Sequence, residues 1–186
     1  MKTKHLLLLG ICFLGFFVGV NGQKYAVDQG ASTISGSLSF STSGGDLYEY
    51  GGDRLTTISL LPTYNYFVAK NLFIGGVLDV SYLAQDGDNI TSFGIGPQLG
   101  YAFGDSSSKV IPYINLGILY QSIKYGSSDN DNEASTGTDL FFGIGVMVPD
   151  KKNLGITFEA NYSMMKIESV SGNVISLGIG IVGLLY

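Results

Sequence analysis

Two carboxyl groups stand where acid–base chemistry could take place. Asp79 and Glu159 each lie in a segment where every second residue is apolar, on the face opposite the apolar residues. A pair of carboxyl groups can divide the roles of general acid and general base. The competing interpretation is structural: both join an interior hydrogen-bonded or ion-pair network with Arg54, Lys124 or Lys166. We favour the structural interpretation.

A second acidic group forms the run Asp129-Asn130-Asp131-Asn132-Glu133. Its oxygen atoms are of the kind that calcium and magnesium bind. An EF-hand loop would need glycine at its sixth place, where Ala134 stands, and a closing glutamate, where Leu140 stands. Asp129, Asp131 and Glu133 therefore predict at most a weak cation site, which could bridge lipid phosphates, and the alternative is a solvated loop. We expect no cofactor.

The first 22 residues have the pattern of a cleaved signal peptide. Lys2 and Lys4 precede an apolar run from Leu6 to Val20, and Gly22 is a small residue that suits the cleavage site. The apolar run is shorter than the roughly 20 residues of a spanning helix, which disfavours an uncleaved anchor. We predict cleavage after Gly22 and one domain from residue 23 to residue 186.

Removal of this peptide limits the chemistry of the exported chain. The only histidine, His5, and the only cysteine, Cys12, are lost with it. We therefore predict that the protein is not an enzyme, because nucleophilic catalysis commonly relies on histidine as a base. Without Lys2 and Lys4, eight of the ten basic residues remain against 15 acidic residues, a net charge of −7. This charge argues against nucleic acid as a partner.

The composition predicts a membrane protein that crosses with strands. Hydrophobic residues make up 45% of the chain and charged residues only 13%, whereas water-soluble domains carry about 25% charged residues. No run after Val20 approaches the length of a spanning helix. In hydrocarbon every backbone polar group must be paired within the protein, so a closed barrel is the remaining solution.

Eight segments alternate between apolar and small or polar residues, with the period of a strand. Between Thr91 and Phe103, for example, Phe93, Ile95 and Leu99 alternate with glycine or polar residues. The predicted fold is therefore an all-β, eight-stranded antiparallel up-and-down transmembrane barrel. The segments are Ser32 to Ser43, Arg54 to Val68, Leu72 to Ala84, Thr91 to Phe103, Val110 to Tyr125, Leu140 to Val148, Leu154 to Ser163, and Val174 to Tyr186. In the Val174 to Tyr186 segment the outward residues, such as Ile181, have odd numbers, whereas the terminal Tyr186 has an even number. We therefore expect a bulge near Gly183.

Alternation alone does not say which face points outward, since a soluble lipocalin-like barrel has its apolar face inside. The absence of tryptophan and the low charge favour the membrane barrel. So do aromatic residues at the strand ends, which predict girdles at the membrane interfaces. The girdle at the short turns is predicted to contain Tyr64, Tyr66, Phe67, Phe73, Tyr101, Phe103 and Tyr113, and the girdle at the other end Tyr48, Tyr50, Tyr82, Tyr120 and Tyr125.

The connections fall into two sets, which are expected at opposite ends of the barrel. The predicted short turns, which would face the periplasm, are Ala69 to Asn71, Gly104 to Ser108 and Pro149 to Asn153. The predicted long outer loops are Ser43 to Asp53, Gln85 to Asn89, Gly126 to Thr138 and Ser169 to Asn173. Lysines gather at the turns and carboxylates in the loops, so the outer face is predicted to be acidic.

The strand pattern, the turn Val68-Ala69-Lys70-Asn71-Leu72 and the terminal Leu184-Leu185-Tyr186 resemble the outer-membrane β-barrel family that includes the OmpA membrane domain and OmpX. The resemblance implies that Tyr186, with Leu184 two residues before it, is a recognition signal for the outer-membrane insertion machinery. Ile181 stands where that family has glycine. The family's barrel enzymes use a histidine, which the exported chain lacks.

These observations predict a monomeric structural or surface-interaction barrel in the outer membrane of a Gram-negative bacterium. Its interior would be filled and its outer loops acidic. Its expected partners are outer-membrane lipid, the insertion machinery and surface or envelope proteins. The alternatives are a narrow pore, an accessory subunit of an outer-membrane complex, and a soluble lipocalin-like binder of apolar ligands.

Overall fold

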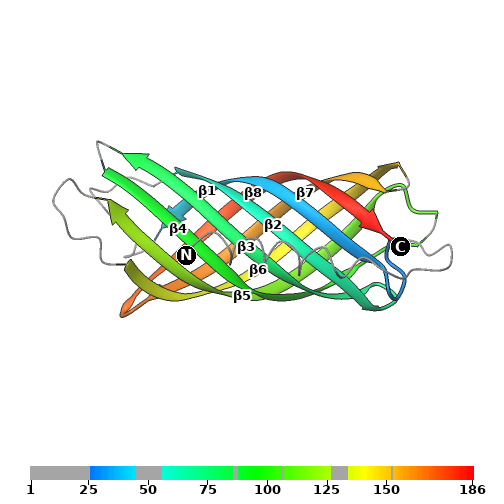
Figure 1. Ribbon diagram of the computed structural model, residues 1–186, viewed down its shortest axis with the longest axis horizontal. Helices are drawn as coiled ribbons and strands as arrows, with labels where there is room; N and C mark the ends of the chain where they lie inside the picture. Colours follow the sequence, from blue (N-terminus) through cyan, green and yellow to red (C-terminus); the bar gives the residue numbers. More distant parts are fainter. Residues whose placement is uncertain (1–25, 45–55, 86–87, 106, 127–133, 152) are drawn as a thin grey trace, which may run out of the picture.

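A computed structural model describes residues 26–44, 56–85, 88–105, 107–126, 134–151 and 153–186. These residues form one closed barrel of eight strands (Figure 1). The strands are β1 (Ser32–Gly44), β2 (Thr56–Ala69), β3 (Leu72–Gln85), β4 (Asp88–Ala102), β5 (Ile111–Gly126), β6 (Ala134–Lys151), β7 (Leu154–Ile167) and β8 (Val170–Leu185). No helix in the described part of the chain is long and apolar enough to cross a membrane.

Each strand pairs antiparallel with its neighbours in the sequence, and β1 closes the barrel by pairing with β8. Closure removes the free strand edges that hydrocarbon does not tolerate. The predicted all-β, eight-stranded antiparallel fold is confirmed.

The apolar faces of the strands point outward. Leu177 and Ile181 of β8 are each 62% exposed, whereas Ser37 and Ser39 of β1 are 4% and 3% exposed. The same arrangement is found around the barrel, where exposed leucines, isoleucines and phenylalanines alternate with buried or half-buried small and polar residues. A soluble barrel would bury its apolar residues and expose its polar ones. The lipocalin-like alternative is therefore wrong.

Three of the aromatic residues assigned to the girdle at the short turns point into the barrel instead. Phe67 and Phe73 are buried and meet edge to face, with ring centroids 5.6 Å apart. Tyr113 is half-buried and packs against the same interior cluster. All three share the parity of the small inward residues on their strands, and aromatic propensity for strands does not distinguish the two faces. Of the second girdle, Tyr82 and Tyr120 are exposed; Tyr48, Tyr50 and the Tyr125 side chain lie outside the description.

Strands at the end away from the termini extend further than the sequence pattern indicates. β3 runs to Gln85 and β4 begins at Asp88, so the predicted Gln85 to Asn89 loop is a two-residue connection. β7 and β8 are likewise joined by Glu168 and Ser169 alone, with Glu168 in the left-handed region at φ 53°. β6 begins at Ala134 rather than at Leu140. Beyond the membrane both faces of a strand can be polar, and the alternation that marks a strand is lost.

The last strand needs no bulge. The pairing of β8 with β1 is continuous through Gly183 to Leu185, and its pairing with β7 is continuous up to Gly183. Val182 and Leu184 point inward and are buried, which continues the parity of Gly178 and Gly180. Tyr186 follows the end of the strand, has the same parity as Val182 and Leu184, and likewise packs against the interior cluster.

Candidate functional site

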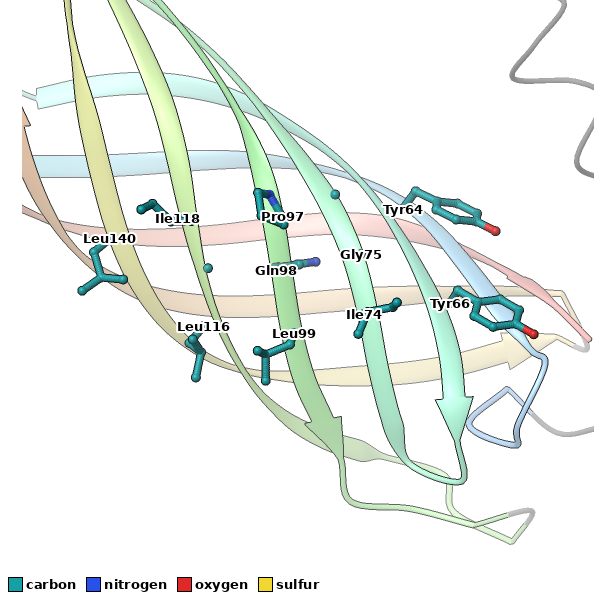
Figure 2. A pocket seen from close by; sticks show the side chains of 12 residues that line it. Tyr64, Tyr66, Ile74, Gly75, Pro97, Gln98, Leu99, Leu116, Ile118 and Leu140 are labelled. Carbon is teal, nitrogen blue, oxygen red and sulfur yellow. The ribbon is translucent and has the colours of Figure 1, made fainter.

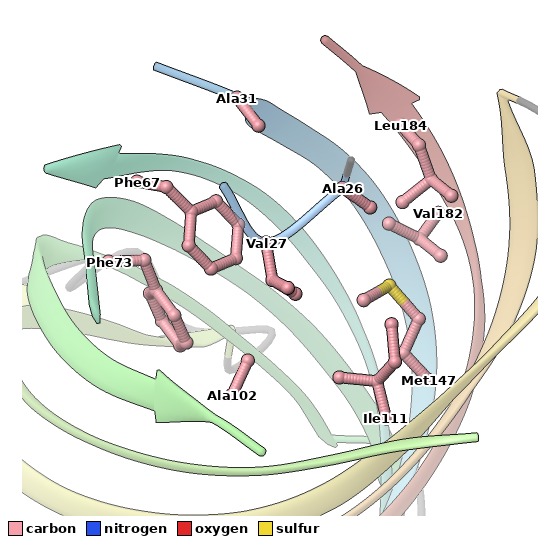
Figure 3. Close-up of a cluster of buried hydrophobic side chains, with 10 residues drawn as sticks. All are labelled: Ala26, Val27, Ala31, Phe67, Phe73, Ala102, Ile111, Met147, Val182 and Leu184. Atoms are coloured by element: carbon pink, nitrogen blue, oxygen red, sulfur yellow. The ribbon is translucent and has the colours of Figure 1, made fainter. Parts of the chain in front are cut away.

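One end of the barrel is closed by the segment that precedes β1. Ala26 and Val27 are fully buried there, within a cluster of apolar residues from six strands (Figure 3). We call it the end cluster; it contains Ala26, Val27, Ala31, Phe67, Phe73, Ala102, Ile111, Met147, Val182 and Leu184, with Tyr113 and Tyr186 packed against it. The sequence pattern did not indicate this role, because residues 26–31 are too few to show a period.

Backbone hydrogen bonds hold this segment against the β2–β3 hairpin. The Asn71 amide donates to the Val27 carbonyl at 2.8 Å, and the Gly30 amide donates to the Phe67 carbonyl at 2.8 Å. Asn71 adopts φ 70°, a left-handed conformation that asparagine tolerates better than most residues. Its side-chain amide donates to the Ala102 and Gly104 carbonyls. The turn thus connects β4 and the N-terminal segment.

A first polar layer follows the end cluster inside the barrel. Gln98 donates to Asn65 at 2.6 Å and accepts from Asn115 at 3.2 Å. On the other side of the interior the Tyr113 hydroxyl donates to the Glu159 carboxylate, which also bonds to Asn161. The layer therefore satisfies its polar groups mainly from within.

The hydrogen bond from Tyr113 to Glu159 leads to a prediction for Tyr113→Phe. We expect the variant to lose about 1–2 kcal/mol of unfolding free energy, because the interior carboxyl group of Glu159 would lose one of its two side-chain donors and keep only Asn161. Tyr120→Phe is the matched control, since Tyr120 is exposed on the outer face of the same strand. Denaturant unfolding in detergent micelles measures both; equal losses would contradict the prediction.

A second polar layer lies further along, beyond an apolar cluster of Val77, Leu119 and Phe141. Asp79 accepts hydrogen bonds from Ser81 at 2.8 Å and from Gln121 at 3.2 Å. Ser81 also pairs with Ser59 at 2.8 Å. A third apolar cluster, Ile123, Met165 and Ile167, follows. Apolar and polar layers thus alternate along the interior.

Asp79 and Glu159 belong to different layers and do not form an acid–base pair. Their partners Gln121 and Tyr113 are eight residues apart on β5, about 26 Å at the rise of a strand. Two carboxyl groups that act on one glycosidic bond are less than about 10 Å apart. Asp79 and Glu159 therefore do not share an acid–base site.

The partners of these carboxylates differ from the expected ones. They are hydroxyl and amide groups, while Lys124 and Lys166 are exposed and Arg54 lies outside the described residues. The sequence reasoning also missed Asp139, which is 4% exposed and hydrogen-bonded to Ser163. Asp139 lies between the predicted Gly126 to Thr138 loop and the predicted strand from Leu140, so no face was predicted for it. Its odd parity, shared with Phe141 and Gly143, could have placed it inside.

The outer face carries an apolar groove of about 730 Å³ over β2 to β6 (Figure 2). Gly76 of β3 and Pro97 of β4, which are paired in the sheet, form its floor. Larger residues of the neighbouring positions form its walls; they are Tyr64, Tyr66, Ile74, Leu99, Leu116, Ile118 and Leu140. None of the described residues that line the groove is charged.

The β4–β5 turn is ordered by Asp105. One carboxylate oxygen accepts from the Ser107 amide at 2.8 Å, the Ser107 hydroxyl at 2.7 Å and the Ser108 hydroxyl at 3.2 Å. These hydrogen bonds hold the Asp105 pKa below its usual 3.8. Those from Ser107 have the largest effect and that from Ser108 follows, while the charge of Lys70 contributes less.

This lowered pKa predicts a pH-dependent contribution of Asp105 to stability. The contribution is fully present above pH 3.8, the ordinary value, and is lost as the pH falls through the lower value of the folded state. The advantage of the wild type over Asp105→Asn should therefore shrink as the pH falls below 3.8. Acid unfolding curves measure this difference. Asp150→Asn, at the same end of the barrel, is the control; an advantage that stays constant in acid would contradict the prediction.

The remaining predicted sites stay predictions. Asp129, Asp131 and Glu133 lie outside the described residues, as does the signal peptide. Leu184 is 1% exposed inside the end cluster, and Tyr186 is half-buried beside it. The insertion machinery would have to recognise a signal formed by these two residues before the barrel closes.

A family model for the outer membrane protein beta-barrel domain matches residues 11–181. The chain belongs to this family. It is a family of outer-membrane proteins of Gram-negative bacteria, and the transmembrane strands of this chain are in accord with it. No curated protein matches the sequence significantly.

Solved structures of outer-membrane proteins share the fold. Neisserial surface protein A is 16% identical with a TM-score of 0.70, and the match covers 83% of this chain and 99% of that one. Ail, the attachment invasion locus protein of Yersinia pestis, solved with a heparin analogue, is 19% identical with a TM-score of 0.55 over 83% and 99%. OprG of Pseudomonas aeruginosa is 15% identical with a TM-score of 0.55 over 88% and 100%. At these identities the likeness concerns the fold alone.

Proposed function

We propose that this family member is a monomeric, non-enzymatic barrel that presents acidic loops at the cell surface, with a packed interior that does not serve as a wide channel. Cleavage after Gly22 would release the chain for insertion. The membrane part would be a scaffold, and the loops between β1 and β2 and between β5 and β6 would meet surface or envelope proteins.

The layered interior carries this proposal. An open channel needs a continuous polar path, but three apolar clusters interrupt the path between the polar layers. An eight-stranded barrel has an interior about wide enough for side chains alone. Within the described residues, the buried oxygens Gln121 Oε1 and Asp139 Oδ1 have no protein donor. Such atoms commonly bind isolated water molecules.

Conductance in planar bilayers tests the interior. We expect no stable steps from the detergent-refolded, heat-modifiable barrel. A variant that replaces Val77 and Leu119 of the central cluster with serine is the comparison, because it removes one apolar barrier. Reproducible conductance steps from the wild type, of the same size in the variant, would contradict the proposal of a packed interior and would favour the narrow pore.

The surface role is supported by the sequence of the loops. In the sequence Asp129, Asp131 and Glu133 fall between β5 and β6, in a connection that we assign to the end away from the termini. The opposite end has mixed charge, since Asp28, Asp105 and Asp150 accompany Lys70 and Lys109 there. Ail was solved in complex with a heparin analogue, a polyanion that acidic loops would repel. We therefore expect this chain to favour cationic surfaces over polyanions.

Cysteine labelling tests which end faces outward. The mature chain would have no cysteine, so Asp131→Cys and Lys70→Cys each introduce one reactive group. In intact cells, a membrane-impermeant maleimide should label Asp131→Cys and leave Lys70→Cys unlabelled until the outer membrane is permeabilised. Labelling of Lys70→Cys alone in intact cells would contradict the proposed orientation. Labelling of the wild type would contradict removal of Cys12.

A further inference from the structure

The groove over β2 to β6 is a hollow bordered by large apolar side chains of the outer face. Around it Ile74, Leu99 and Ile118 are between 46% and 51% exposed. Between them the paired Gly76 and Pro97 leave the sheet nearly bare. Its volume is about 730 Å³, and it is an open groove on the surface rather than an enclosed cavity.

Closure of the barrel does not require this hollow. A Cβ atom added at Gly76 would meet nothing closer than the Gly96 carbonyl oxygen at 3.9 Å. At the adjacent Gly75, which faces inward, a Cβ atom would come within 2.2 Å of the Tyr64 carbonyl oxygen. Gly75 is therefore needed for packing, whereas Gly76 leaves space for something outside the chain.

The sheet itself is modified at the same place. Where β4 pairs with β5, Ile95 is opposite Tyr120 and Gln98 is opposite Gly117, and the pairing is interrupted at Gly96 and Pro97. Proline has no N–H to donate, which removes a ladder hydrogen bond. Its ring also projects less than the leucine or isoleucine side chains beside it. The hollow therefore extends from β3 toward β5.

The chemistry of the groove fits an acyl chain. It lies on the outward face of an outer-membrane barrel, where hydrocarbon is the solvent, and none of the described residues that line it is charged. An empty hollow would cost its walls their dispersion contacts. Tyr64 and Tyr66 stand on β2 toward the end with the termini, and tyrosine is the residue type that sits at the headgroup level. The Tyr64 hydroxyl already pairs with Ser32 at 3.2 Å, which leaves its ring as a fixed wall.

We propose that this groove binds one acyl chain of a phospholipid from the leaflet nearest the chain termini, with the headgroup beside Tyr66. The chain would lie along Gly76 and Pro97 and would exchange more slowly than lipid around the rest of the barrel. This requires only that the barrel is embedded in a membrane, and it holds whether or not the loops bind a partner.

Photolabelling of the folded protein in liposomes tests the proposal. The probe is phosphatidylethanolamine with a diazirine in one acyl chain, at trace level in phosphatidylethanolamine and phosphatidylglycerol. Peptide mapping should place adducts on Ile74, Leu99 and Ile118 about tenfold above those on Leu177 and Ile179 of β8, a ratio equivalent to about 1.4 kcal/mol of preferential binding. Even labelling around the barrel would overturn the proposal, as would protection of the groove by a second copy of the chain.

A pair of glycine variants provides the matched comparison. Gly76→Leu fills the groove, whereas Gly36→Leu adds the same side chain at another glycine with open space, since a Cβ there meets nothing within 4 Å. Adducts at Ile118 should fall about tenfold in Gly76→Leu and stay unchanged in Gly36→Leu. Equal labelling in the two variants would overturn the proposal. A heat-induced shift in gel mobility shows whether each variant is folded. If Gly76→Leu does not fold, the distribution of adducts on the wild-type protein alone decides.

Discussion

Val27→Asp should lower the free energy of unfolding by about 3 kcal/mol or more, because it places an unpaired carboxylate in a fully buried apolar cluster. The end cluster joins the N-terminal segment to Phe67, Met147 and Leu184, so the loss should affect the whole barrel. Denaturant unfolding in detergent micelles, followed by circular dichroism because the chain has no tryptophan, measures the effect.

Val170→Asp is the matched control for this variant. Val170 begins β8 beside the two-residue connection at the opposite end and is exposed. We expect it to change the unfolding free energy by less than about 0.5 kcal/mol. If both aspartate variants unfold at the same denaturant concentration, the N-terminal segment is not a packed part of the folded barrel.

Gly75→Ala and Gly76→Ala should have opposite outcomes although the residues are neighbours. At Gly75 the added Cβ would lie 2.2 Å from the Tyr64 carbonyl oxygen and 2.1 Å from Asn65 Oδ1, and backbone cannot move aside cheaply. Overpacking of this kind costs about 1–3 kcal/mol. At Gly76 the Cβ has free space, so we expect a change near zero or a slight gain from the lower entropy of the unfolded chain.

The comparison of the two alanine variants contains its own control, because both share strand, neighbours and substitution. Unfolding free energies and the fraction of heat-modifiable protein after refolding are the measurements. Equal stability of the two variants would show that the interior of the barrel adapts to an added methyl group, and that the inward glycines are not required by crowding.

The sequence was sufficient to predict the fold because the solvent imposes it. Hydrocarbon demands an apolar residue at every second position, as at Phe93, Ile95 and Leu99, and this pattern is visible without a structure. The inward parity of Asp79 and Glu159 followed from the same rule. The hydrogen-bond partners of these two residues on other strands could not be predicted from the rule. They depend on the stagger and tilt of the strands, which the sequence of a single strand does not encode.

Other features could not be predicted because the alternation of apolar and polar residues carries no information about them. Phe67 and Phe73 fit a girdle and an interior cluster equally well by residue type. The ends of β3, β4 and β6 lie in polar sequence where the alternation vanishes. The groove arises from Gly76 facing Pro97 across two strands, and only the register brings these residues together.

The end cluster also has consequences for the order of assembly. Val27 comes from the start of the described chain, whereas Val182 and Leu184 come from its last strand. Contacts between residues so distant in sequence form late, since chain entropy must first be overcome. The N-terminal segment therefore gains its full packing only once β8 has joined β1. Its burial would report completed closure, and a barrel stalled before the last strand would leave this segment accessible to a protease.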